Sequence, residues 1–230
     1  MVYNCINNIL TLLYPAPCLL CDTPAQDAIC PDCQADLPHN RHSCRCCGLP
    51  LTLADEATCG HCLAHPPAVD RSFIPYLYAA PIDQLIGRFK FSGQLAQGRL
   101  LSRLLADHLR QRAEMPDLLI PVPLHPQRLR QRGYNQALEL AKPLARQLGL
   151  ALDHQSCRRI QPTPPQHELK KHQRKRNIRG AFQVTRTPAV NHVALVDDVV
   201  TTGSTVNELA KCLKQRGVAR VDVWAVARTP

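Results

Sequence analysis

A segment near the C-terminus holds the residues with the clearest chemistry in this chain of 230 residues. It reads Asp197-Asp198-Val199-Val200-Thr201-Thr202-Gly203-Ser204-Thr205 and follows the apolar run 193–196. Gly203 permits unusual backbone dihedrals, and N–H and hydroxyl groups at the start of a helix form a cradle for a phosphate dianion. Two carboxylates beside a phosphate would repel it, so Asp197 and Asp198 need a different task. Accepting hydrogen bonds from the vicinal hydroxyls of a ribose, with Mg²⁺ nearby to offset charge, provides one.

Four Cys-x-x-Cys pairs form a second group of chemically active residues. They are Cys18/Cys21, Cys30/Cys33, Cys44/Cys47 and Cys59/Cys62. Two residues between thiolates let both sulfurs face one ion, and tetrahedral Zn²⁺ requires two such pairs. The eight cysteines therefore predict two closed, structural Cys₄ zinc sites, which supply folding free energy to a segment too small for a core of its own.

Redox motifs and disulfides are the alternatives for these cysteines. Thioredoxin-type Cys-x-x-Cys motifs do not occur in fours, and disulfides are rare in a reducing compartment. Pairing of consecutive motifs is favoured, and an interleaved arrangement stays open. Cys46 lies inside the third pair and is able to replace a neighbour, whereas Cys5, Cys157 and Cys212 are expected to be ordinary buried thiols.

Two basic segments are candidates for binding phosphate groups. Residues 123–133 contain Arg128, Arg130 and Arg132, and guanidinium groups bind pyrophosphate oxygens bidentately. Arg132 is the preferred residue, and a solvated basic turn is the alternative. Residues 158–179 carry eight basic side chains against one glutamate. For this second segment, binding of a nucleic-acid backbone is nearly as well supported as binding of pyrophosphate, although aromatic side chains for base stacking are scarce.

An α/β pattern begins near residue 72 and must position these groups. Apolar runs predict strands at 73–79, 118–122, 192–196 and 221–227, and helical spacing appears at 82–89, 95–109, 137–148 and 204–216. The segment 123–133 is expected to be a loop. Strands that alternate with helices favour a mostly parallel sheet with helices on both faces. Ligands bind at the carboxyl ends of such strands, where the segment 197–205 falls.

Charge and cysteine content divide the chain near residue 70. Residues 1–70 hold two basic and seven acidic residues, a net charge of −5, and residues 71–230 hold 26 basic and 11 acidic residues, a net charge of +15. We therefore expect a zinc-binding domain at 1–66, with a docking helix near its start, and an α/β domain at 70–230. The basic charge of the larger domain favours a polyanion or a phosphorylated ligand.

Composition excludes several classes of protein. Hydrophobic residues make up 45% of the chain, which excludes a mostly disordered protein. No apolar run approaches the about 20 residues of a membrane span, and the N-terminus lacks the basic start and cleavage site of a secretory signal. A cytoplasmic protein is expected.

The segment 197–205 resembles the phosphoribosyl pyrophosphate (PRPP) loop of type I phosphoribosyltransferases. The resemblance implies that Asp197 and Asp198 bind the ribose and act in catalysis, and that the 5′-phosphate is held by Thr201, Thr202, Gly203, Ser204 and Thr205. The implied reaction displaces Mg²⁺-bound pyrophosphate from C1 of PRPP by an acceptor. Purine-salvage enzymes carry an acidic residue where this chain has Thr201, so a catalytic base is missing at that position.

In phosphoribosyltransferases a mobile hood closes over the ligand and excludes water. The resemblance places this hood at about 158–180, where Arg159 or Arg176 would neutralise pyrophosphate together with Arg128 and Arg132. Lys90, between two phenylalanines, is either a ligand contact or a capping charge on a helix.

Further motifs extend the likeness over nearly the whole chain. They are the cysteine pairs, Pro121-Val122-Pro123-Leu124, Arg132-Gly133-Tyr134-Asn135-Gln136, Thr163-Pro164-Pro165-Gln166, Arg176-Asn177 and Gly180-Ala181-Phe182. Together they resemble the ComF family of competence proteins, in particular its GntX branch. The resemblance implies a role in the uptake or utilisation of external DNA, with single-stranded DNA and a DNA-uptake or helicase protein as candidate partners. A PRPP sensor without catalysis, or an adaptor that handles single-stranded DNA, is the alternative.

Overall fold

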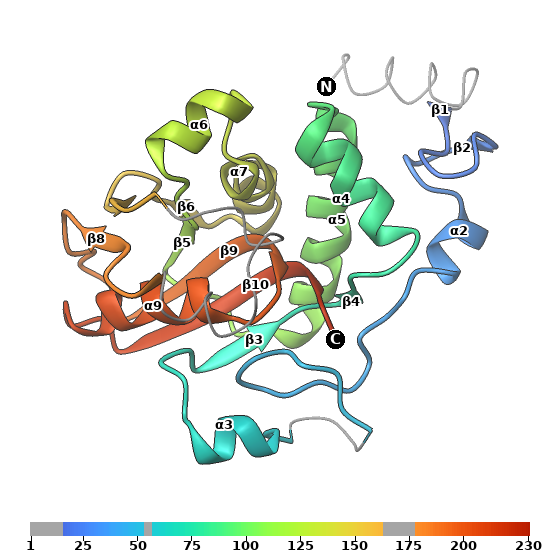
Figure 1. Ribbon diagram of the computed structural model, residues 1–230. Coiled ribbons are helices and arrows are strands. Elements are labelled where there is room, and N and C mark those ends of the chain that lie inside the picture. The colour runs from blue at the N-terminus through green and yellow to red at the C-terminus, as the bar shows by residue number, and fades with distance from the viewer. Residues whose placement is uncertain (1–15, 53–56, 163–177) are drawn as a thin grey trace.

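The fold is built on a parallel sheet, seen in a computed structural model that describes residues 16–52, 57–162 and 178–230 (Figure 1). The sheet has six strands: β3 (Arg71–Phe73), β4 (Tyr76–Leu77), β5 (Leu118–Pro121), β6 (Ala151–Leu152), β9 (His192–Val200) and β10 (Arg220–Arg228). Their order is β3-β10-β9-β5-β6, and β4 also pairs with β10. Every pairing in this sheet is parallel. The long central strands β9 and β10 are therefore flanked on both sides.

Helices cover both faces of this sheet. One face carries α4 (Ile82–Phe91), α5 (Leu95–Arg112) and α7 (Gln136–Leu148), and the other carries α9 (Ser204–Lys214) (Figure 1). Alternate residues of β9 and β10 enter the two cores: Val196 and Trp224 join the cluster of α4, α5 and α7, whereas Leu195 and Val223 join that of α9. Burial on both faces explains why these strands are continuously apolar. The predicted α/β fold class is confirmed.

A small antiparallel pair adjoins α9. It consists of β7 (Cys157–Arg159) and β8 (Phe182–Val184), with Cys157 opposite Val184. Phe182 and Val184 are buried in the same core cluster as the apolar face of α9. In the sequence, these two strands lie at the two ends of the segment predicted as a hood, most of which lies outside the described residues.

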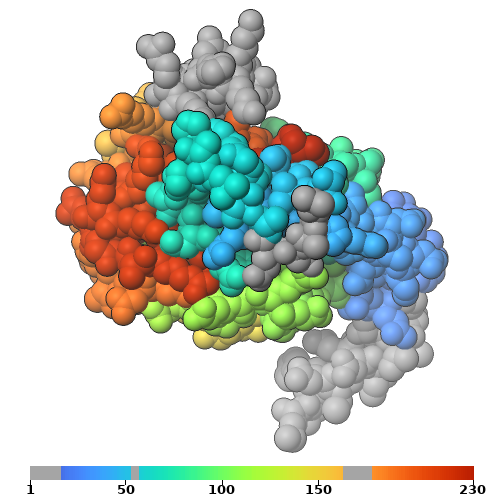
Figure 2. Space-filling model, turned by 90° about the horizontal axis from the view of Figure 1, so that it is seen from below, coloured from blue at the N-terminus to red at the C-terminus, as the bar shows by residue number. Residues whose placement is uncertain are grey.

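The cysteine-rich segment forms two ribbons that pack on the α/β part of the protein. The first ribbon (residues 16–37) holds β1 (Ala16–Pro17), β2 (Pro24–Ala25) and α2 (Pro31–Ala35). The second ribbon (described residues 40–52 and 57–65) holds α3 (Gly60–Ala64). Ile29 and Leu37 of the first ribbon belong to the core cluster of α4 and α5. Seen from below, the second ribbon (blue to cyan) lies against the C-terminal segment (red) (Figure 2). The predicted domain boundary at residues 66–70 stays a prediction, and the docking helix predicted near the N-terminus lies outside the described residues.

Two sequence-based predictions of local structure are wrong. Residues 123–133 contain a helix, α6 (Pro126–Arg132), rather than only a loop. It begins at Pro126, where the missing N–H costs nothing, and ends at Gly133 with φ of 82°. The strand predicted at 73–79 is divided into β3 and β4, because Pro75 has no N–H to donate to the sheet. No helix in the described part of the chain is long and apolar enough to cross a membrane.

Candidate functional site

A cavity of about 640 Å³ opens at the carboxyl end of β9. One wall is the turn between β9 and α9, from which Thr201, Gly203, Ser204 and Thr205 line the cavity. Gly203 has φ of 73°, in the left-handed region, and directly precedes the first residue of α9. This conformation places the start of an 11-residue helix at the cavity, and a helix N-terminus favours an anion. We call residues 201–205 the phosphate loop.

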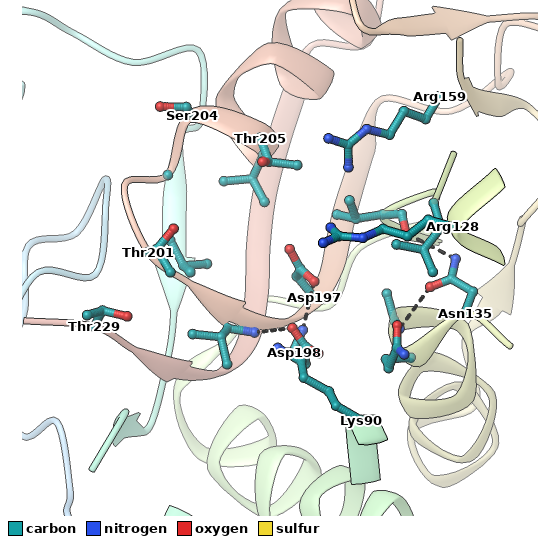
Figure 3. Close-up of a pocket in the computed structure, with 18 of the residues that line it drawn as sticks. Lys90, Arg128, Asn135, Arg159, Asp197, Asp198, Thr201, Ser204, Thr205 and Thr229 are labelled. Carbon is teal, nitrogen blue, oxygen red and sulfur yellow. Dashed lines mark hydrogen bonds and ion pairs between the residues drawn. The ribbon is translucent and has the colours of Figure 1, made fainter. Parts of the chain in front are cut away.

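The acidic pair lies in the floor of the same cavity (Figure 3). Strand β9 continues to Val200, so Asp197 and Asp198 are strand residues and do not follow the strand. Asp197 Oδ1 accepts a hydrogen bond from Asp198 N (2.9 Å), and Asp198 Oδ1 accepts one from Val199 N (2.7 Å). Asp198 Oδ2 lies 2.9 Å from Lys90 Nζ at the end of α4. Burial and the neighbouring Asp198 carboxylate raise the pKa of Asp197 to about 7.

Arginines form the wall opposite the phosphate loop. Arg128 and Arg132 come from α6 and Arg159 from β7, and all three line the cavity. Figure 3 shows the guanidinium groups of Arg128 and Arg159 extended toward the space above Asp197. Arg132 lies 5.4 Å from the ring centroid of Phe91. Burial and the nearby Arg128 charge lower the pKa of Arg159, which Asp197 opposes. The cavity therefore has an acidic floor between a cationic wall and a helix N-terminus.

The eight cysteines of the four pairs gather in two groups. The first Cys₄ group is Cys18, Cys21, Cys30 and Cys33, and the second is Cys44, Cys47, Cys59 and Cys62. Within each group all sulfur atoms lie within 4.8 Å of one another. Four sulfurs at about 2.3 Å from a tetrahedral zinc are about 3.8 Å apart. The Sγ atoms of Cys21 and Cys30 are 3.7 Å apart, and those of Cys47 and Cys59 are 3.8 Å apart. Both groups thus fit structural zinc, in the consecutive pairing favoured from the sequence.

The two ribbons repeat one local structure. In each, the N–H of the third cysteine donates to the sulfur of the first: Cys30 N to Cys18 Sγ at 3.4 Å, and Cys59 N to Cys44 Sγ at 3.3 Å. Burial opposes the thiolate form, but backbone N–H donors lower the pKa of Cys18 to about 6 and of Cys44 to about 7. Such donors stabilise thiolates in their metal-binding form. Cys46 lies outside the second group, so it replaces none of the paired cysteines there.

Comparison with known proteins identifies both parts of the chain. A double zinc ribbon domain model matches residues 9–63, and a phosphoribosyl transferase domain model matches residues 134–230. DNA utilization protein YhgH of Escherichia coli K12 is 38% identical over an alignment of 226 positions, and the match covers 95% of this chain and 99% of that protein. The chain belongs to the ComF family. The ComF-family chain is also 36% identical to Competence protein F of Haemophilus influenzae, over 89% of this chain and 92% of that protein.

Solved structures similar to this ComF-family chain are more distant. The protein TT1426 from Thermus thermophilus is 18% identical with a TM-score of 0.36, and the match covers 58% of this chain and 83% of that one. A purine phosphoribosyltransferase from Pyrococcus horikoshii is 19% identical with a TM-score of 0.35, over 58% of this chain and 74% of that one.

The ComF-family chain gathers most of its predicted ligand-binding residues in one cavity. Lys90, Arg128, Arg132, Arg159 and the acidic pair line it together with every residue of the phosphate loop except Thr202. Lys90 lies in the last turn of α4 and its Nζ reaches Asp198, so it is a cavity contact. Thr202 instead lines a second cavity, between the loop and the second ribbon, and its Oγ1 is 2.9 Å from Ser204 Oγ. Arg176 lies outside the described residues.

Several further residues of the cavity had no predicted role. Among them are Tyr78, Phe91, Asn135 and Thr229. Asn135 caps α7, since its Oδ1 accepts from Ala137 N (3.0 Å) and its Nδ2 donates to Val122 O (3.1 Å). The position of an asparagine just before an amphipathic helix is a sequence signal for such a cap. Thr229 and Tyr78 carry no comparable signal.

Proposed function

We propose that this ComF-family protein binds PRPP in the cavity at the end of β9 and transfers its phosphoribosyl group to an acceptor. The observation that carries the proposal is the joint placement of the Asp197–Asp198 pair, the phosphate loop and the arginine wall around one space. The volume of about 640 Å³ lies within the range of small-molecule sites.

Each part of PRPP has a chemically matched position. The phosphate loop would take the 5′-phosphate on backbone N–H and hydroxyl groups. The carboxylates of Asp197 and Asp198 would accept hydrogen bonds from the ribose 2- and 3-hydroxyls, and Arg128, Arg132 and Arg159 would bind the pyrophosphate. Mg²⁺ bound with PRPP would neutralise part of the pyrophosphate charge and stabilise it as a leaving group.

Transfer requires departure of pyrophosphate from C1 and attack by the acceptor. The arginine wall would stabilise negative charge that develops on the leaving oxygen, while the carboxylate of Asp197, bound to the ribose hydroxyls, would stabilise positive charge that grows on the ribose. Lys90 pairs directly with Asp198, so its ammonium group offsets part of the negative charge of the cavity floor below a polyphosphate. Thr201 supplies no base, so the acceptor would attack without deprotonation by the loop.

Calorimetric titration with PRPP and Mg²⁺ tests binding. Wild-type protein is expected to bind PRPP and to melt at a higher temperature with it, whereas the double variant Asp197→Asn/Asp198→Asn is expected to do neither. Absence of binding by wild-type protein at any Mg²⁺ concentration would refute the proposal. Pyrophosphate release in the presence of candidate nucleobases then distinguishes a transferase from a PRPP sensor.

A second candidate function is binding of a single-stranded DNA backbone. A separate cavity of about 290 Å³ lies between the second ribbon, β3 and α5, and is lined by Arg41, Arg45, Arg71, Arg112 and His108. Such a concentration of guanidinium groups, with no carboxylate among the described lining residues, suits phosphodiesters. The names of the relatives, which mention DNA utilization and competence, agree with it. A protein partner and a cytoplasmic location stay predictions.

The two functions are separable by charge reversal. Arg41→Glu/Arg112→Glu is expected to weaken salt-sensitive binding of single-stranded DNA and to leave PRPP binding unchanged. If only Arg174→Glu/Arg176→Glu weakens DNA binding, the DNA site is the hood, and the cavity between ribbon and α5 is not involved.

A further inference from the structure

The second ribbon is hydrogen-bonded to the sheet through one Cys-x-x-Cys turn. Three successive carbonyls of this turn accept bonds from the α/β part of the protein. Ser72 donates from its N–H to Arg45 O (2.7 Å) and from its hydroxyl to Cys46 O (2.7 Å). Arg228, the last residue of β10, donates from Nε to Cys47 O (2.9 Å). Both β3 and β10 are thus anchored to a turn that contributes Cys44 and Cys47 to the second Cys₄ group.

The guanidinium group of Arg228 also holds the start of the phosphate loop. Its Nη1 donates to the carbonyls of Thr201 and Thr229, and to Val200 O at 3.3 Å. Arg228 is only 5% exposed, so water does not replace these bonds readily. Arginine suits the position because its planar fork carries five donors in fixed geometry. One side chain therefore connects Cys47 of the second Cys₄ group to Thr201 of the phosphate loop.

Charge strengthens this connection. Burial lowers the pKa of Arg228, and the nearby sulfurs of Cys47, Cys59 and Cys44 oppose this shift. Four thiolates around one Zn²⁺ would carry a net charge of 2−. A buried cation requires such a counter-charge. The described part of the first ribbon has a similar contact without this link, since Arg88 donates from Nη1 to Leu19 O (3.1 Å) but is not among the residues lining the cavity.

We propose that Arg228 is a positioning residue that couples the second zinc site to the phosphate loop. Metal in the second Cys₄ group fixes Cys47 O, this carbonyl orients the guanidinium group, and the guanidinium group fixes the carbonyls of Val200 and Thr201. The inference rests on the proposed function only in treating residues 201–205 as the ligand-binding loop. The mechanical coupling itself requires no PRPP.

Hydrogen exchange of the zinc-loaded full chain tests the coupling directly. In Arg228→Gln we expect both zinc ions to be retained and amides of β5 to be unchanged. The two amides that donate to carbonyls at the phosphate loop, Thr229 N to Val200 O and Asn207 N to Gly203 O, should exchange at least about tenfold faster. Cys62→Ser is expected to lose one zinc ion and to accelerate the same two amides. The two changes together should add nothing further, because each breaks the same connection.

Matched changes at the first ribbon are the controls. Arg88→Gln, and Cys33→Ser with one zinc ion lost, are expected to leave exchange of the phosphate loop unchanged. Unchanged loop exchange in Arg228→Gln, or equal acceleration by Cys33→Ser, would overturn the proposal. If Arg228→Gln does not fold, Arg228→Lys replaces it, because one ammonium keeps the charge but cannot bond to the ribbon and the loop together.

The rate of zinc release is a second readout, because zinc binding and PRPP binding must affect each other reciprocally if they are coupled. A purely structural role of Arg228 would not change this reciprocal effect. If zinc tightens PRPP binding through Arg228, PRPP must slow loss of one zinc ion to a chelator by the reciprocal effect, and Arg228→Gln must abolish this slowing. Failure of wild-type protein to bind PRPP in calorimetry would refute the proposed function alone. The exchange experiment would still decide the coupling.

Discussion

Lys90 Nζ lies 2.9 Å from Asp198 Oδ2, which joins the last turn of α4 to the floor of the cavity. Both side chains are largely buried, with 18% and 10% of their surfaces exposed. A phenylalanine stands on each side of Lys90, and Phe89 is fully buried in the core. Packing of α4 therefore holds the ammonium group where the acidic pair needs a counter-charge.

Removal of this ammonium group should destabilise the protein. Lys90→Met keeps the length of the side chain but leaves the carboxylate of Asp198 buried without its partner, which we expect to cost about 1–3 kcal/mol of unfolding free energy. Lys142→Met is the matched control, because Lys142 and its partner Glu139 form a more solvent-exposed pair within α7, and its loss should cost under about 0.5 kcal/mol. Denaturant unfolding of both variants measures the difference, and equal losses would contradict a special role for Lys90.

The raised pKa of Asp197 predicts a pH-dependent affinity for PRPP. A carboxyl with a pKa of about 7 is partly protonated in the empty protein at neutral pH, whereas ribose hydroxyls require the carboxylate. Binding should therefore release a proton, and the Kd should fall as pH rises through 7 and level off above it. Calorimetry in buffers of different ionisation enthalpy counts the protons. The control is Asp197→Asn with Asp198 intact. This variant lacks the titrating carboxyl, so the remaining pH dependence of its Kd comes from the phosphates of the ligand.

The same shift has a consequence for the stability of the empty protein. The folded-state pKa of Asp197, about 7, lies above the ordinary value of 3.8, so its contribution to stability is fully present below the unfolded pKa and is lost progressively as pH rises to the folded pKa. Asp197→Asn should accordingly melt at a higher temperature than wild-type protein, by a margin that grows as pH rises from the unfolded to the folded pKa and levels off above it. A melting difference that is independent of pH would show that Asp197 is already ionised when the cavity is empty.

The acidic pair and the phosphate loop were predictable because their chemistry is contained in nine consecutive residues. Asp197 through Thr205 span the end of a strand, a left-handed glycine and a helix start, all of which are local signals. The Cys₄ groups were predictable for the same reason, since the spacing within each pair is a local property. Local spacing did not decide between consecutive and interleaved grouping, and the sulfur positions in the structure give the consecutive one.

The remaining parts of the site depend on tertiary packing. Lys90 acquires its partner only because α4 lies beside β9, and Tyr78 and Thr229 reach the cavity because β4 pairs with β10. Helix α6 was missed because no buried residue marks an apolar face, so hydrophobic periodicity carried no signal. The contact between Arg228 and Cys47 joins residues 181 positions apart, and nothing in either local sequence indicates it.

Loss of the cap on α7 should act on the cavity through α6. Asn135 accepts from Ala137 N and donates to Val122 O, so it fixes the connection between the arginine wall and α7. Asn135→Ala is expected to cost about 1 kcal/mol of unfolding free energy and to weaken PRPP binding, whereas Asn135→Asp retains the cap acceptor and should recover most of the stability. Chemical unfolding and calorimetry of the two variants measure both effects. A cap without a role at the site would change stability and leave the Kd unaltered.

Gly203 provides a test of loop shape that is independent of charge. Its φ of 73° is strained for any other residue, although an added Cβ would meet only Val200 Cγ1 at 3.9 Å. Gly203→Ala should therefore cost about 1–2 kcal/mol, either as lost stability or as a distorted loop that no longer fits a phosphate. Gly93 is a matched control, with φ of 63°, open space around its Cβ position and no place among the residues lining the cavity. We expect Gly93→Ala to lower the melting temperature to a similar extent while PRPP binding stays at the wild-type level. Equal loss of binding in both variants would show that the effect comes from general destabilisation and that the shape of the phosphate loop is not its cause.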